Sequence, residues 1–278
     1  MPTLRYVVCD VFTDTPLTGN QLAVFTDGRG VDTELMQRLA REMNFSETVF
    51  VLPADGEGDA RIRIFDPFHE MPFAGHPTLG AAFVLAAPMQ LGVITLETGA
   101  GPVPIVLDRD EGGRIVFGRM QQPLPKVELF ARAEEALAAV GVRSSTLPIE
   151  IYDNGARHLI LSFGSVAELA GLRGDAEAIR ALGITGINCI APDGERWRNR
   201  MFWENGEDPA TGSAAGPIAC HLCRHGLLEW GSEVVIDQGV ELGRPSVLHA
   251  RAEGGGGLID AVEVGGSAVT VARGEFRL

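Results

Sequence analysis

One run of ten residues, 207–216, places carboxylates and a hydroxyl beside a tight glycine turn. Asp208 comes shortly before Gly212, and Ser213 follows directly, with small residues that can open a helix behind them. A helix start leaves backbone N–H groups unpaired and carries partial positive charge, and glycine lets an anion approach them. The run therefore predicts an anion-binding site with an acid–base group beside it. An N-cap followed by close helix packing would produce the same pattern.

A second run, 73–82, has the same character. His76 follows Gly75, and an apolar stretch typical of a helix comes after it. Gly75 and Gly212 lie about half the chain apart, so the sequence indicates two versions of one unit. Two half-molecules facing each other would bring two helix starts to one cleft, and we expect the active site there.

Glu47 is the third candidate for acid–base chemistry. It lies where a predicted helix over 33–42 gives way to an apolar strand over 47–52. Burial in a dry cleft disfavours the charged form of a carboxylate, which can then hold or release a proton near neutral pH. The competing interpretation is a solvated loop charge.

The elements that must position these groups are short strands that alternate with a few helices. The segment 122–125 contains two prolines and marks a change of unit. We therefore predict an N-terminal lobe over 1–121 and a C-terminal lobe over 122–265. The final residues, 266–278, are expected to complete the N-terminal lobe, although either lobe could take them. Further helices are predicted over 78–85, 128–140, 166–172, 176–181 and 214–225.

Composition narrows the class of protein. A formal net charge of −14 leaves no basic stripe to neutralise phosphates, so nucleic acid is not an expected partner. No segment approaches the roughly 20 apolar residues that a membrane span requires. The first residues go directly into an apolar strand pattern and lack the features of a secretory signal, so we expect a cytoplasmic protein.

Cysteines and cofactor motifs offer little alternative chemistry. Cys220, His221, Cys223 and His225 have a spacing that suggests metal ligands, but a packed helix face produces it too, and a second cysteine pair is missing. The glycine-rich, P-loop, zinc-protease and nucleophile-elbow motifs are also missing from the sequence. We therefore expect neither a metal nor a cofactor, and acid–base work by side chains remains.

Over its whole length the sequence resembles the PhzF phenazine-biosynthesis isomerases, within the superfamily that shares the diaminopimelate epimerase fold. Gln21 stands where proline is usual after Gly-Asn, which affects turn stiffness more than chemistry. The motifs that carry the resemblance are 19–20 with 23–25, 36–44, 46–48, 72–77 and 208–216, and the stretches 196–202 and 239–246 resemble the phenazine branch in particular.

The resemblance implies an α+β fold of two pseudo-symmetric lobes, each with a curved, largely antiparallel sheet wrapped around a central helix. It implies a cofactor-independent isomerase of trans-2,3-dihydro-3-hydroxyanthranilate, a small anionic cyclohexadiene amino acid. The product would be an aminoketone that pairs with a second copy toward the phenazine skeleton. A homodimer is also expected from the resemblance.

The resemblance also assigns roles to the candidate residues. Glu47 would carry the proton between ring carbons, with His76 and Asp208 as the other catalytic groups. Gly75, Gly212 and Ser213 would bind the substrate. Two alternatives stay open: an amino-acid racemase or epimerase on the same fold, and a non-catalytic small-molecule binding protein. The epimerases use two opposed thiols, and Ala74 and Asp208 stand where we would look for them.

Overall fold

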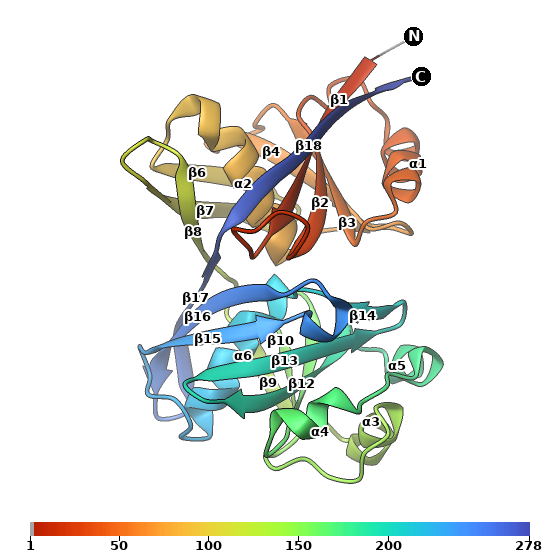
Figure 1. Ribbon diagram of the computed structural model, residues 1–278, viewed down its shortest axis with the longest axis vertical. Helices are drawn as coiled ribbons and strands as arrows, with labels where there is room; N and C mark the ends of the chain where they lie inside the picture. The colour runs from red at the N-terminus through yellow and green to blue at the C-terminus, as the bar shows by residue number, and fades with distance from the viewer. Residues whose placement is uncertain (1–2) are drawn as a thin grey trace. The chain divides into compact units, whose positions relative to one another are not determined.

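The computed structural model describes residues 3–278 and has the mixed α+β architecture that the resemblance implies. The chain divides into two compact units. Unit 1 comprises Met1–Gln121 and Gly265–Leu278, and unit 2 comprises Gln122–Val264 (Figure 1). Each unit has a set of paired strands, called its sheet below, and a central helix, and each unit is described by itself.

Unit 1 is built around the helix α2 (Gly75–Met89), which packs against strands of the sheet that include β1, β2 and β8. Nearly every position along the first three turns of α2 is buried, as expected for a helix that is apolar all round. The remaining elements of unit 1 are β1 (Thr3–Val11), β2 (Asn20–Phe25), α1 (Thr33–Met43), β3 (Glu47–Leu52), β4 (Ala60–Phe65), β5 (Glu70–Met71), β6 (Val93–Thr98), β7 (Gly101–Arg109), β8 (Ile115–Gln121) and β18 (Ala268–Arg277).

Unit 2 is built around α6 (Gly212–Arg224), which packs against β11, β15 and β16. Its other elements are β9 (Lys126–Leu129), α3 (Ala133–Ala139), β10 (Glu150–Asp153), β11 (Arg157–Ser162), α4 (Val166–Ala170), α5 (Ala176–Leu182), β12 (Gly186–Asp193), β13 (Arg196–Trp203), β14 (Gly206–Asp208), β15 (Glu233–Gln238), the 3-10 turn η1 (Val240–Leu242), β16 (Ser246–Gly255) and β17 (Leu258–Gly266).

The two sheets repeat one pattern of strand pairing. In unit 1, β1–β2 and β3–β4 are antiparallel, whereas β2–β3 and β4–β6 are parallel. In unit 2, β10–β11 and β12–β13 are antiparallel, whereas β11–β12 and β13–β15 are parallel. The short strands β5 and β14 each pair antiparallel just before a central helix begins. The half-chain repeat inferred from the glycine turns is therefore present in the topology.

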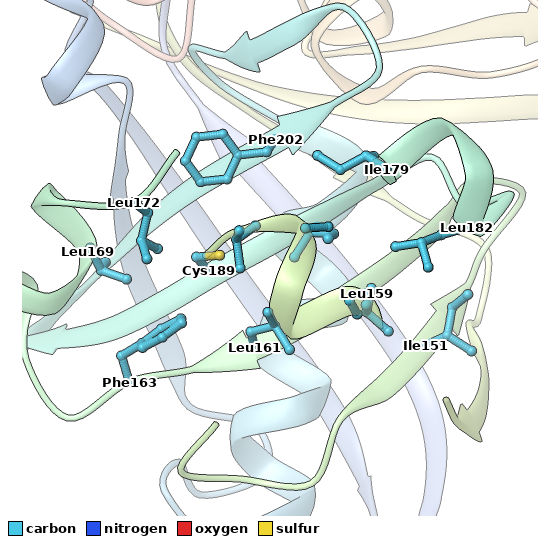
Figure 2. Packing of buried hydrophobic residues seen from close by; sticks show 14 of the residues in the cluster. Ile151, Leu159, Leu161, Phe163, Leu169, Leu172, Ile179, Leu182, Cys189 and Phe202 are labelled. Carbon is cyan, nitrogen blue, oxygen red and sulfur yellow. The ribbon is translucent and has the colours of Figure 1, made fainter. Parts of the chain in front are cut away.

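Each sheet is covered on its other face by smaller helices. In unit 1, α1 buries Met36 and Leu39 against phenylalanines of the sheet, including Phe25 and Phe50. In unit 2, α3, α4 and α5 cover a cluster in which Cys189 packs as a small hydrophobe (Figure 2). The labelled members of this cluster are Ile151, Leu159, Leu161, Phe163, Leu169, Leu172, Ile179, Leu182, Cys189 and Phe202.

The bounds of two predicted helices differ most from those in the structure. The helix expected over 78–85 spans Gly75–Met89, because Pro77 falls in the first turn, where its missing N–H costs no bond. The helix expected over 128–140 is wrong at its start. Residues Lys126–Leu129 instead form β9, which pairs antiparallel with β10, and α3 begins only at Ala133. No helix among the described residues is long and apolar enough to cross a membrane.

Candidate functional site

Glu47 and His76 meet within unit 1. Helix α1 ends at Met43, and the next residue, Asn44, has a left-handed backbone (φ 52°) that turns the chain, so that Glu47 becomes the first residue of β3. His76 is the second residue of α2. The Nδ1 atom of His76 lies 3.3 Å from the Oε2 atom of Glu47, and the carboxylate side chain is 15% exposed. A carboxyl group therefore faces a ring nitrogen at hydrogen-bond range, at the junction that the sequence predicted.

The His76 imidazole is neutral at physiological pH. Burial lowers its pKa to about 3, and a hydrogen bond with the Gln21 backbone opposes this only in part. The contact therefore joins a carboxyl oxygen to an uncharged ring, and it is not an ion pair between two charges. The other ring nitrogen, Nε2, is buried and has no hydrogen-bond partner among the described residues. A ligand oxygen at this nitrogen would satisfy it.

The side chain of Asn20 extends this group. Its Nδ2 atom lies 3.4 Å from His76 Nδ1, and its Oδ1 atom lies 3.2 Å from the Ser46 hydroxyl oxygen. Ser46 directly precedes Glu47 in the chain, so the amide of Asn20 connects the residue before β3 to the first turn of α2. Unit 1 thus holds a cluster of Glu47, His76, Asn20 and Ser46.

Asp208 lies in unit 2 at the end of β14. Its Oδ2 atom accepts a hydrogen bond of 2.6 Å from the Thr211 hydroxyl. Gln238, on β15, donates from Nε2 both to the backbone carbonyl of Asp208 (2.8 Å) and to the Thr211 hydroxyl oxygen (2.9 Å). The carboxylate is therefore held by the residue before α6, and a buried amide of the sheet contacts that residue and the Asp208 backbone.

Ser213, the second residue of α6, contacts a second buried histidine. Its Oγ atom lies 2.9 Å from Nε2 of His158, which is fully buried on β11. Burial lowers the pKa of His158 to about 4, although the negative charge of Asp153 opposes the shift, so this imidazole is also neutral. Asn154 donates to the backbone carbonyl of Ser213 at 2.9 Å.

Gly75 and Gly212 begin the two central helices, as the glycine turns predicted. The residues before them, Ala74 and Thr211, make no side-chain capping bond, and the first turns contain no acidic residue. Their N–H groups and partial positive charge are therefore not neutralised by these side chains. Close packing, by contrast, explains why residue 216 is a glycine, because a Cβ atom there would lie 2.4 Å from a methyl group of Val262.

The thiol positions differ from the expectation. The residue before α2 is Ala74, and the residue before α6 is Thr211, so Thr211 is the counterpart of Ala74. Asp208, which we expected there, is the last residue of β14 and corresponds to Met71, the last residue of β5. All four cysteines are buried and unpaired. Burial raises the pKa of Cys9 and Cys220 to about 12 and that of Cys223 to about 11, and it raises the pKa of Cys189 as well. None of these thiols stands at a helix start.

One group of side chains in unit 2 has the composition of a metal site. Ligand atoms of Glu150, His221 and His225 lie within 4.8 Å of one another. The Glu150 carboxylate already accepts a hydrogen bond of 2.8 Å from Tyr152 and lies 3.2 Å from the Arg224 guanidinium. Burial alone would raise the pKa of Glu150, but hydrogen bonds with His221, Tyr152, His225 and Arg224 outweigh it and lower the pKa. Because Arg224 supplies the positive charge, the group fits a structural hydrogen-bond hub better than a cation site.

Sequence reasoning missed the amides and the second histidine that support Asp208 and Ser213. His158, Asn188, Asn199 and Gln238 all lie on strands of unit 2 and are nearly fully buried. For His158 and Asn188 the available signal was a polar residue among apolar neighbours of a strand, which needs a buried partner. Asn199 and Gln238 gave no such signal, because charged residues flank them in β13 and β15. The residues are scattered over 80 positions, so only the fold identifies those partners.

Comparison with known proteins identifies the relatives of this chain. The family model for phenazine biosynthesis-like proteins, PhzC-PhzF, matches residues 9–274. The trans-2,3-dihydro-3-hydroxyanthranilate isomerase of Pseudomonas aeruginosa is 50% identical over 277 residues, which cover 99% of both chains. The enzyme of the same name from Pseudomonas chlororaphis is 48% identical with the same coverage.

Solved structures with this fold include both isomerase-family proteins and epimerases. The PhzF-family protein of Bacillus anthracis has a TM-score of 0.88 at 26% identity and covers all of both chains. A hydroxyproline epimerase from Agrobacterium vitis has a TM-score of 0.69 at 12% identity, covering 98% of this chain and 92% of its own. The second likeness concerns the fold alone, which is the diaminopimelate epimerase-like fold.

Proposed function

The chain belongs to the phenazine biosynthesis-like (PhzC-PhzF) family, and from this premise we propose that it is an isomerase of trans-2,3-dihydro-3-hydroxyanthranilate. Its curated relatives at about half identity carry that name over the full chain. The reaction only moves protons within the substrate and needs no oxidant or reductant, so side chains that accept and return a proton suffice.

Glu47 is the proton carrier in this proposal. Its carboxylate removes the proton from the ring carbon that bears the hydroxyl, and the electrons of that C–H bond enter the conjugated diene. The carboxyl group then returns a proton to another carbon of the conjugated system. The resulting enol becomes a ketone by moving its hydroxyl proton to carbon, so substrate and product have the same atoms. The aminoketone is then suited to pair with a second copy.

The contact between Glu47 and His76 supports this role most directly. The Oε2 atom of Glu47 lies 3.3 Å from the Nδ1 atom of His76, and burial keeps the imidazole neutral. A neutral imidazole can donate a hydrogen bond to the carboxylate or accept one from the carboxylic acid. His76 therefore accommodates Glu47 both before and after proton removal without a buried net charge of its own.

The substrate-binding roles fall to groups at the two helix starts. Backbone N–H groups at Gly75 and Gly212 suit the substrate carboxylate and the negative charge that spreads over the diene during proton transfer. The Ser213 hydroxyl adds a donor to an oxygen of the substrate carboxylate. Asp208, held by Thr211, is assigned to the ring amine. None of these contacts requires a metal.

The competing reactions have less support. A two-thiol epimerase needs a cysteine at each helix start, where this chain has Ala74 and Thr211. Burial raises the pKa values of the buried thiols, so at neutral pH they are protonated and cannot accept a proton. A non-catalytic binding protein would have no need of a carboxyl group paired with a buried neutral imidazole.

Isotope transfer in deuterated water tests the reaction. We expect loss of the diene absorbance and deuterium on a ring carbon that was unsaturated in the substrate, or return of the substrate's own proton if the carboxyl group is shielded. A substrate deuterated at the hydroxyl-bearing carbon should react more slowly if C–H cleavage limits the rate. Deuterium only at a saturated α-carbon, with the diene absorbance unchanged, would favour an epimerase, and an unchanged substrate would favour a binding protein.

Location and assembly complete the proposal. Four free thiols fit a reducing compartment, and we place the protein in the cytoplasm. A symmetric homodimer is the proposed assembly, since twofold pairs are the most common among soluble oligomers. Sedimentation at micromolar concentration would test it.

A further inference from the structure

A chain of buried amides in unit 2 links Asp208 to Ser213. It runs from Gln238 on β15 to Asn199 on β13, Asn188 on β12 and His158 on β11. Strands alternate their side chains between two faces. Leu159 and Cys189 belong to the cluster under the outer helices, so their neighbours His158 and Asn188 point to the opposite face, where α6 packs.

Backbone groups fix the direction of Gln238. Its Oε1 atom lies 3.2 Å from the backbone N–H of Thr211, which can only donate. Its Nε2 atom lies 2.8 Å from the backbone carbonyl of Asp208, which can only accept. Turning the amide over would place oxygen against oxygen and N–H against N–H. The oxygen and nitrogen of Gln238 therefore have one arrangement that satisfies both contacts.

The arrangement of Gln238 determines which atoms of the next two amides, Asn199 and Asn188, donate and which accept. Asn199 must present N–H to Gln238 Oε1, at 2.9 Å, so its Nδ2 atom is the one that also meets Asn188 at 3.3 Å. Asn188 must then accept through Oδ1. Its Nδ2 atom is left facing two groups, the carbonyl of Leu159 and the Nδ1 atom of His158, both at 3.4 Å.

The same logic sets the tautomer of His158. Because Asn188 presents N–H to Nδ1, that ring nitrogen must be an acceptor, and the proton of the neutral ring sits on Nε2. Nε2 donates to the Ser213 oxygen at 2.9 Å. The Ser213 hydroxyl therefore has its own proton left to donate elsewhere. This arrangement is the reverse of a serine nucleophile, whose proton would point at the imidazole.

A second branch from Gln238 orients Thr211. Gln238 Nε2 donates to the Thr211 hydroxyl oxygen at 2.9 Å, so the hydroxyl proton is directed to the Asp208 carboxylate at 2.6 Å. One amide thus determines the direction of two hydroxyls, one on each side of the start of α6.

We propose that Gln238, through Asn199, Asn188 and His158, is a positioning residue that fixes Ser213 as a hydrogen-bond donor to a substrate oxygen and Thr211 as a donor to Asp208. The role of Ser213 toward substrate rests on the proposed isomerase function. The directions of the hydrogen bonds do not, and they can be measured without substrate.

Nitrogen-15 NMR of the full-length protein, labelled at histidine, tests the direction in the unaltered protein. We expect His158 to show a protonated Nε2 and a bare Nδ1 throughout pH 6–8, with its signals assigned by their loss in His158→Gln. A proton on Nδ1 would overturn the proposal. This result stands even if the wild type fails to convert the substrate, in which case the proposed function is wrong but the hydrogen-bond direction is still decided.

Asn188→Asp should reverse the relay, because a carboxylate of the same shape can only accept. His158 would then carry a proton on Nδ1, and Ser213 would turn its own proton toward the ring when that ring is neutral. We expect the NMR signature to change and KM to rise about tenfold, the effect of losing one hydrogen bond to a charged group, with kcat nearly unchanged. An unchanged tautomer and KM in a folded variant would contradict the relay.

Two further variants separate positioning from simple destabilisation. His158→Gln keeps an amide N–H near the place of Nε2, so it should hold KM within about threefold of the wild type. Ser162→Ala is the matched control, because it removes a hydroxyl from another buried histidine of unit 2, His221, outside the relay. It should leave KM and the His158 signals as they are. A tenfold rise of KM in Ser162→Ala would attribute the effect to packing instead.

Discussion

The two central helices begin alike, but different side chains contact their first turns. Both α2 and α6 start with glycine, lack a side-chain cap and have no acid in the first turn, and each follows a short strand that pairs in the same way. The second helical residue is His76 in unit 1 and Ser213 in unit 2. The backbone of the repeat is thus shared, and its chemistry depends on the side chains that reach each helix start.

The partners differ in whether a proton can move between them. In unit 1, the neutral imidazole of His76 lies beside the carboxyl group of Glu47, and a carboxyl group can accept and return a proton. In unit 2, Ser213 meets His158, whose tautomer is set by amides that backbone groups hold in one direction. One helix start is therefore suited to moving a proton, and the other to holding one in place.

This difference predicts different kinetic signatures for the two units. Groups that act only while the C–H bond breaks lower kcat when they are removed. Groups that hold the substrate equally in the ground state and the transition state raise KM instead. Substitutions in unit 1 should therefore change kcat, and substitutions in unit 2 should change KM.

The largest effect is expected for Glu47→Gln. Glutamine keeps the shape and much of the hydrogen bonding of the side chain, but it cannot carry the proton. Turnover should fall at least about a hundredfold, within the range typical of lost general acid–base catalysis, while substrate binding survives. Glu42→Gln, an exposed position at the end of α1, is the control and should keep wild-type turnover. Normal turnover in Glu47→Gln would remove the proton carrier from the proposal.

A smaller effect is expected for Ser213→Ala. It removes one donor to the charged substrate, which is equivalent to about 1.5–3 kcal/mol, so KM should rise tenfold or more with kcat nearly constant. Steady-state kinetics that follow the diene absorbance would measure both constants. A large fall in kcat instead would show that Ser213 acts in the proton transfer, and the division of roles between the units would be lost.

The positions of Glu47 and His76 at the starts of their strand and helix in unit 1 could be predicted from the local sequence. The capped helix α1, with Asp32 accepting from the Leu35 N–H at 2.8 Å, and the apolar run after Ser46 together place Glu47 at a strand start. A histidine after a glycine at the beginning of an apolar run likewise predicts a helix start. The contact between Glu47 and His76 could be found only from the fold, because no local sequence pattern gives the distance between β3 and α2.

The relay in unit 2 could not be predicted because its members are separated along the chain. Asn188, Asn199 and Gln238 each stand in a strand whose other residues are mostly apolar, and they come together only through the pairing of β12, β13 and β15. The same cause explains the wrong helix start at Glu128. Pairing of β9 with β10 overrides the local helical preference of that segment.

The last effect expected concerns stability rather than kinetics, and it is a pH dependence that comes from the two buried histidines. Burial lowers the pKa of His76 to about 3 and that of His158 to about 4, from an ordinary value of 6.5. Below 6.5 the unfolded chain binds protons that the folded chain refuses, so the free energy of unfolding should fall as pH drops. The stabilisation that comes from these neutral histidines is fully present above pH 6.5. Below pH 6.5, each histidine lowers the free energy of unfolding by at most about 1.4 kcal/mol per pH unit, until the pH reaches its pKa in the folded protein.

Urea unfolding of the wild type, His76→Gln and His158→Gln at pH 7, 6 and 5 measures this dependence. Each variant should show a shallower decline than the wild type, because one group no longer titrates. Thr98→Val removes a hydroxyl that donates to the Gly101 carbonyl, far from any histidine in sequence, and should shift stability equally at every pH. A decline of unaltered slope in His158→Gln would mean that this ring is protonated in the folded protein. A protonated ring has N–H on both nitrogens, so Asn188 could not donate to it, and the contrast between a mobile and a fixed proton would then have to be abandoned.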